Sequence, residues 1–107
     1  MRRGEIWWAA LPEPAGRRPV VLVSRDAAYA VRAAITVVGL STRVRGIASE
    51  VALSKRDGLP RACVANADNL ATIPKSWLRE RITALAPTKQ AALDAALRFS
   101  LGLDDTR

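Results

Sequence analysis

Arginine is the side chain in this sequence that is best suited to bind a negatively charged partner. The chain has 17 lysines and arginines against 10 acidic residues, a formal net charge of +7, and its only lysines are Lys55, Lys75 and Lys89. The guanidinium group is a permanently charged, planar fork of donors that matches phosphate oxygens and stacks on nucleobases. Such a basic domain favours a polyanion such as nucleic acid, although a solvated arginine-rich surface would give the same count.

Histidine is absent from the sequence, and Cys63 is its only cysteine. These absences exclude a zinc site built from Cys and His ligands, and they exclude a Ser-His-Asp or Cys-His catalytic apparatus. A disulfide within the chain is excluded as well. Cys63 lies in the apolar stretch 62–65, so we expect it to be a small buried core residue and not a nucleophile.

Short apolar runs separated by polar turns predict a sheet of short strands that carries the polar side chains. We expect strands at residues 5–10, 19–24, 34–40, 50–53, 62–65, 70–73 and, at an edge, 81–85. The strand at 70–73 continues the one at 62–65 beyond a polar island, 66–69. Single helical turns are expected at 26–32 and 75–78.

The clearest helix begins at Pro87, because proline suits a first turn. One largely apolar stripe of this helix contains Leu93, Ala96, Leu97, Ser100 and Leu101. Gly102 stands where a C-cap glycine ends a helix. Short strands with one terminal helix predict a mainly β fold with α, a small and strongly bent barrel-like sheet against which the helix packs. Residues 1–107 suffice for one domain, which self-association would stabilise.

Location can also be predicted from apolar patterning. Half of the residues are hydrophobic, and no apolar run approaches the ~20 residues that span a bilayer. The first eight residues include two arginines but neither an apolar signal core nor a cleavage site. We therefore expect a mature N-terminus, no membrane association and a cytoplasmic protein.

Five segments, in order along the chain, resemble motifs of the MazF/PemK family of toxins. They are residues 3–8, 16–24, 38–42, 64–72 and 86–103. In the second segment, Gly-Arg-Arg-Pro-Val-Val-Leu-Val-Ser is similar to the family's Gly-x-Arg-Pro-Val-Leu-Val-hydrophobic-Ser signature. Each motif alone is weak, but the five together cover essentially the whole chain.

The resemblance implies both a fold and an activity. Members of the family are SH3-like barrels of the CcdB/PemK type that form homodimers. They cleave single-stranded RNA at short sequences, and we expect messenger RNA or loops of transfer or ribosomal RNA as targets. The activity needs no metal and no cofactor. An acidic cognate antitoxin is the expected protein partner, with one segment in the RNA groove.

Metal-free cleavage uses the RNA's own 2′-OH as nucleophile, so the protein must move protons and stabilise charge on the phosphate. Arg18 matches the family's catalytic arginine, and its fixed charge suits the transition state but not a base. Ser41 matches the active-site threonine, with Thr42 beside it. Either hydroxyl can donate to a phosphate oxygen, and either can instead satisfy local backbone.

Asp68 matches the family's Asp in the later motif. It is the candidate for a general base or for orienting Arg18, and it is equally explained as a turn residue. Asn66 and Asn69 flank it, and their amides can contact base edges. The side chains expected to bind substrate are Arg17, Thr42, Arg43, Arg45, Asn66 and Asn69. The loop at 11–17 is shorter than in many members of the family.

Two other functions compete with the nuclease. One is a basic SH3-like module that binds RNA without cutting it, in which case Arg18, Ser41 and Asp68 are incidental. The other is a gyrase inhibitor that resembles CcdB. That function relies on an aromatic C-terminal ending, whereas this sequence closes Asp-Asp-Thr-Arg at 104–107.

Overall fold

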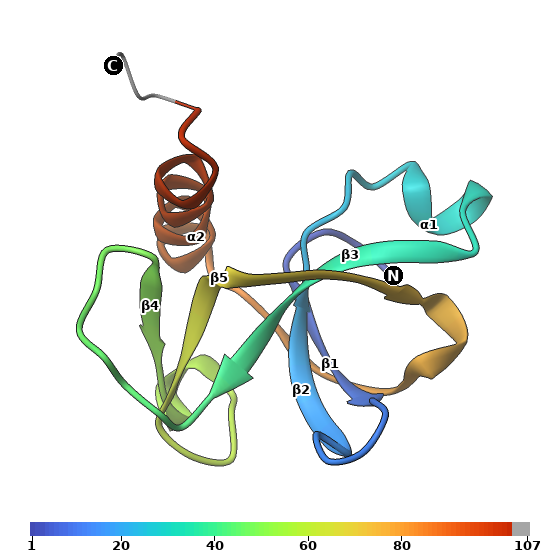
Figure 1. Ribbon diagram of the computed structural model, residues 1–107, viewed down its shortest axis with the longest axis horizontal. Coiled ribbons are helices and arrows are strands. Elements are labelled where there is room, and N and C mark those ends of the chain that lie inside the picture. Colours follow the sequence, from blue (N-terminus) through green and yellow to red (C-terminus); the bar gives the residue numbers. More distant parts are fainter. Residues whose placement is uncertain (104–107) are drawn as a thin grey trace.

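A computed structural model describes residues 1–103 of the chain, and the ending at 104–107 lies outside the described residues. One antiparallel sheet of six strands, in the order β4-β5-β3-β2-β1-β6, curls into a half-open barrel (Figure 1). The strands are β1 Glu5–Ala10, β2 Arg17–Leu22, β3 Ala34–Ser41, β4 Glu50–Leu53, β5 Cys63–Pro74 and β6 Leu78–Ala84. The predicted mainly β fold with a C-terminal helix is confirmed.

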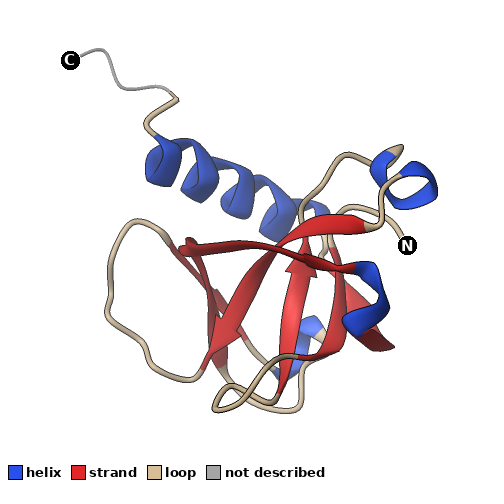
Figure 2. Ribbon diagram, turned by 45° about the vertical axis from the view of Figure 1, so that its right-hand side comes forward, coloured by secondary structure: helices blue, strands red, loops and turns tan. Residues whose placement is uncertain are grey.

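Two α-helices accompany the sheet. The single turn α1, Ala28–Val31, lies between β2 and β3, and α2, Pro87–Leu101, follows β6 and lies across the sheet near β4 and β5 (Figure 2). Short 3₁₀ turns at Lys55–Asp57 and Lys75–Trp77 connect strands. Gly102 ends α2 with φ +66°, as the sequence predicts. Neither of these helices is long and apolar enough to cross a membrane.

β5 is the strand that bends the sheet most. Its first part pairs with β4 and with the end of β3, where Ala65 faces Leu40. Its second part pairs with the rest of β3, where Leu70 faces Val38. On the side of β3, residues 66–69 of β5 therefore stand against Gly39 alone. Extra residues on one strand of a pair make that strand turn.

Two apolar clusters fill the barrel. The larger one lies beneath α2 and includes Ile6, Val38 and Leu93, all 0% exposed. The second cluster, around Leu22 and Tyr29, lies toward α1. Together they bury both sides of the curled sheet, which fits the β-branched residues of β3, Ile35, Thr36, Val37 and Val38.

The two edges of the sheet carry charged groups. β6 exposes Arg79, Glu80 and Arg81 in succession. At β4 the Nζ of Lys89, from α2, donates a hydrogen bond of 2.6 Å to the carbonyl of Ala52. The predicted edge position of the last strand is thus confirmed, although β6 begins earlier than expected.

The structure corrects several predicted boundaries. β2 begins at Arg17 rather than at residue 19, because both arginines pair with β1 across the hairpin, Arg17 with Ala10 and Arg18 with Ala9. The expected continuation of strand 62–65 into 70–73 is confirmed, and the polar island between them belongs to the same strand, β5. Leu101, which we expected in the buried stripe of α2, is 54% exposed.

Leu93→Ala tests how far α2 supports the barrel. Deleting this fully buried side chain leaves a cavity, so the free energy of unfolding should fall by about 2–5 kcal/mol. The matched control is Leu101→Ala on the same helix, where loss of an exposed leucine should change it by less than about 0.5 kcal/mol. Urea unfolding at one protein concentration measures both. Equal effects would contradict the packing described here.

Candidate functional site

A pocket of about 410 Å³ lies where β2 begins and β3 ends. Its lining includes Arg17, Arg18, Ser41 and Thr42. The register of the sheet explains this meeting, because Val20 pairs with Gly39 and the same antiparallel register extended by two residues puts Arg18 opposite Ser41. Four of the residues predicted from sequence are therefore brought together.

The hairpin loop between β1 and β2 holds Arg18. This loop is closed by a hydrogen bond from the Leu11 N–H to the Gly16 carbonyl, 3.0 Å. Arg18 Nε donates to the carbonyl of Ala15 within it, also at 3.0 Å. No residue in 1–103 accepts a hydrogen bond from the two terminal nitrogens of Arg18. The guanidinium is thus anchored at one nitrogen and keeps its outer donors for a ligand.

Trp8 forms one wall of the pocket. The guanidinium carbon of Arg17 lies 4.5 Å from the centre of the Trp8 ring, a cation–π contact. Trp7 points to the other face of β1, where it packs against the second cluster and its Nε1 donates to Glu5. Of these two neighbouring tryptophans, Trp8 lines the pocket and Trp7 does not.

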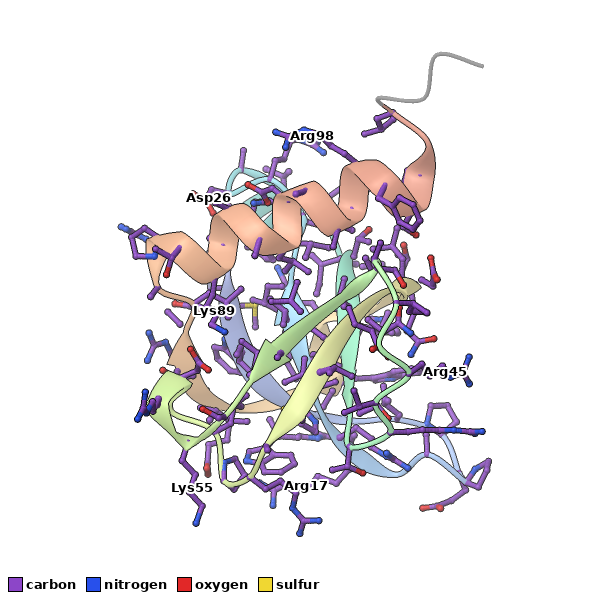
Figure 3. The ribbon with its side chains drawn as sticks, turned by 90° about the vertical axis from the view of Figure 1, so that its left-hand side faces the viewer. Arg17, Asp26, Arg45, Lys55, Lys89 and Arg98 are labelled. Atoms are coloured by element: carbon purple, nitrogen blue, oxygen red, sulfur yellow. The ribbon has the colours of Figure 1, made fainter. Side chains whose placement is uncertain are left out.

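A second, smaller pocket adjoins the first at Ser41. Its lining residues are Ser41, Arg43, Arg45, Asn66 and Asn69. The loop that carries the two arginines is folded on Glu50, whose carboxylate accepts from the backbone N–H groups of Arg45 and Gly46. In Figure 3 Arg45 points outward from this loop, and Arg17 projects from the end of the molecule opposite α2.

Asp68 lies apart from both pockets. One carboxylate oxygen accepts from Ser49 Oγ at 2.9 Å, and the other accepts from Ser100 Oγ at 2.7 Å. These two hydrogen bonds, that from Ser100 first, lower the pKa of Asp68 below its ordinary value of 3.8. A carboxylate stabilised in its charged form is a weaker base. The structure therefore brings Arg18 and Ser41 together but does not bring Asp68 to them.

Sequence reasoning missed several residues at the site. Leu59, Pro60 and Arg61 complete the first pocket, and they come from what looked only like a turn-rich loop. Ser49, whose side chain is 0% exposed, bonds to the 66–69 segment, and a lone serine carries no pattern that would reveal this. Cys63 is buried, as predicted, and burial raises the pKa of its thiol, although it also touches the pocket.

Known proteins are similar to this chain over nearly its whole length. The family model of the PemK-like, MazF-like toxins of type II toxin–antitoxin systems matches residues 2–101. Probable endoribonuclease MazF2 of Mycobacterium tuberculosis is 41% identical over 103 residues, which are 95% of this chain and 99% of that protein.

Solved structures agree with the sequence matches. Toxin MazF-mt6 of Mycobacterium tuberculosis has a TM-score of 0.84 and 31% identity, covering 92% of this chain and 96% of its own. An endoribonuclease in complex with its cognate antitoxin, from a mycobacterial species, has a TM-score of 0.84 and 29% identity, covering 96% of both chains. The similarity therefore extends over the curled sheet and α2 alike.

Asp68→Asn should lower stability in a pH-dependent way. Because folding lowers the pKa of this carboxyl, its stabilising effect is present above pH 3.8 and is lost as the pH falls through the lower pKa of the folded state. The wild type should therefore exceed the variant in stability at pH 7, and the gap should close below pH 3.8. Urea unfolding between neutral and strongly acidic pH measures this. A gap that stays constant throughout would argue against the carboxylate's hydrogen bonds as its source.

Proposed function

The chain belongs to the PemK-like, MazF-like toxins of type II toxin–antitoxin systems, and from this premise we propose that it is an endoribonuclease that cleaves single-stranded RNA. The observation that carries the proposal is the pocket that is lined by both Arg18, anchored by the Ala15 carbonyl, and Ser41. Relatives named endoribonucleases match the chain over nearly its full length.

The reaction that suits these groups is transesterification within the RNA. The ribose 2′ oxygen forms a bond to the adjacent phosphorus while the bond from phosphorus to the 5′ oxygen breaks. The 2′-OH loses its proton and the leaving 5′ oxygen gains one, so the products are a 2′,3′-cyclic phosphate and a 5′-OH. DNA lacks the 2′-OH and is not cut.

Within this reaction we assign charge stabilisation to Arg18. Its free guanidinium nitrogens can donate to the non-bridging phosphate oxygens, whose negative charge grows in the transition state. The hydroxyl of Ser41 or Thr42 adds a further donor in the same pocket. Arg17, Arg43 and neighbouring arginines bind flanking phosphates, which makes binding weaken as salt rises.

The role of Asp68 as general base remains a prediction, and its contacts favour a different one. Its carboxylate is bonded to hydroxyls of Ser49 and Ser100, outside the pocket of Arg18. We propose that Asp68 is a positioning residue that holds the 66–69 segment, and with it Asn66 and Asn69, in place beside Ser41.

The proposed partners follow from the family and from charge. A net charge of +7 suits both RNA and an acidic antitoxin, and one similar endoribonuclease has been solved with its cognate antitoxin. We propose an antitoxin that competes with RNA for the two pockets. We also propose a homodimer and a cytoplasmic location, where RNA targets are abundant.

Arg18→Ala should lower RNA cleavage in excess EDTA by about 100- to 1000-fold, because it removes the main donor to the transition state. The matched control is Arg79→Ala, which removes an exposed arginine of β6 that lines neither pocket and should leave the rate unchanged. Product ends are identified by mass spectrometry. RNA that binds but stays intact with the wild type would make the chain a binding module, and full activity in Arg18→Ala would remove that residue from catalysis.

The pH–rate profile of Asp68→Asn separates the two roles of this carboxylate. A positioning residue should raise KM and leave the shape of the kcat profile unchanged. Loss of a general base would instead lower kcat throughout this range, because the wild-type carboxyl, whose pKa lies below 3.8, is ionised across it. Steady-state cleavage of a fluorogenic RNA between pH 4 and pH 9, about the range in which carboxyl and amine groups titrate, records both parameters.

A further inference from the structure

The small pocket beside Ser41 has a chemical character of its own. Its side chains are almost all hydrogen-bond donors, and Ser41 is shared with the pocket that holds Arg18. We propose that it is a base-recognition subsite that selects a keto base, guanine or uracil, at a nucleotide flanking the cleaved phosphate. The inference rests on the proposed nuclease function and adds a rule about its substrate.

Asn66 is the residue that determines this selectivity. Its side-chain oxygen accepts a hydrogen bond from the backbone N–H of Asp68 at 3.0 Å. The same oxygen lies 2.9 Å from Ser49 Oγ, whose single hydrogen is shared between it and the Asp68 carboxylate. Since a backbone N–H can only donate, the amide cannot be turned around. The residue is 8% exposed, and no group in residues 1–103 accepts from its Nδ2. The part of Asn66 left for a ligand is therefore a donor.

The other lining groups reinforce this polarity. Ser41 Oγ accepts from the backbone N–H of Arg43 at 3.0 Å, which leaves its own hydrogen for a ligand. The guanidinium groups of Arg43 and Arg45 contain only hydrogen-bond donors and no acceptor atom. Asn69 alone offers an amide oxygen as well as a donor. Donors therefore outnumber acceptors in this lining, which favours a ligand group that accepts hydrogen bonds.

Among the bases, this preference separates keto from amino edges. Guanine presents O6 and N7, and uracil presents O4, all of which are acceptors, whereas adenine and cytosine place an amino group at the corresponding position. The pocket encloses only about 60 Å³, room for the edge of a base and not for a whole ring. An amino group there would face Nδ2 of Asn66, donor against donor, which predicts a preference of about 10- to 100-fold.

Two sequencing experiments on the wild type test the rule. Cleavage of an RNA pool with a randomised segment should yield cuts with guanine or uracil fixed at one flanking position. In parallel, the protein is bound to a randomised 2′-O-methyl RNA pool, which the proposed reaction cannot cleave, and the retained molecules are sequenced. Keto enrichment in the retained pool without any cleavage of RNA would support the subsite and refute the nuclease. Cleavage that accepts adenine and cytosine equally at both flanking positions, or a retained pool without keto enrichment, would overturn the subsite.

Asn66→Asp tests the assigned atom. The substitution keeps the side-chain shape but replaces the Nδ2 donor by an acceptor, so the keto preference should be lost. Arg79→Gln is the matched control, since it changes the net charge equally at an exposed site on β6 outside both pockets. If Asn66→Asp does not fold, the wild type is tested instead on RNA with 2-aminopurine in place of the selected guanine, or 2-pyrimidinone in place of uracil. Removing the keto oxygen should slow cleavage about 10- to 100-fold, and an unchanged rate would overturn the assignment.

Discussion

The offset of β5 against β3 is the constraint on which the rest of this structure depends. Four residues of β5, 66–69, stand against the single residue Gly39, so the strand cannot continue straight and divides into two directions. One half pairs with β4 and packs under α2, and the other half closes the sheet toward α1. Both pockets lie beside this turn. A regular pairing would flatten the sheet and remove the bend beside which the pockets of Arg18 and Asn66 lie.

Hydrogen bonds from the hydroxyls of Ser49 and Ser100 hold residues 66–69 of β5 in this offset position. Ser49, just before β4, bonds to Asn66 and Asp68, and Ser100 of α2 bonds to Asp68 from the other side. Extra residues in a strand leave polar groups without their usual ladder partners, and burying such groups unpaired is costly. Here loop, strand and helix each supply a partner. The polar groups that stay free are those that face the pockets, as a recognition site requires.

The sequence predicts those parts of the molecule that depend on local periodicity. β1, β4 and α2 follow from apolar spacing, and Gly102 ends α2 where expected. The continuation of β5 through the polar island is predicted, but the bend of β5 is not, because its offset is decided by pairing with the distant strand β3. Arg18 and Ser41 are identified by resemblance, and only the fold shows that they line one pocket. The partners of Asp68 come from residues 19 and 32 positions away, beyond the range of any local pattern.

The charged groups at the two edges of the sheet affect whether a toxin that is made in excess of its partner aggregates. An open sheet presents unpaired backbone groups at both ends, which invite another chain to add a strand and so begin aggregation. The successive charges of β6 oppose such stacking, and at β4 the Lys89 ammonium already occupies the Ala52 carbonyl. A toxin whose sheet edges are protected in this way does not aggregate through those edges when it is released from an inhibitor. Its potency then depends on how much toxin is made and not on its solubility.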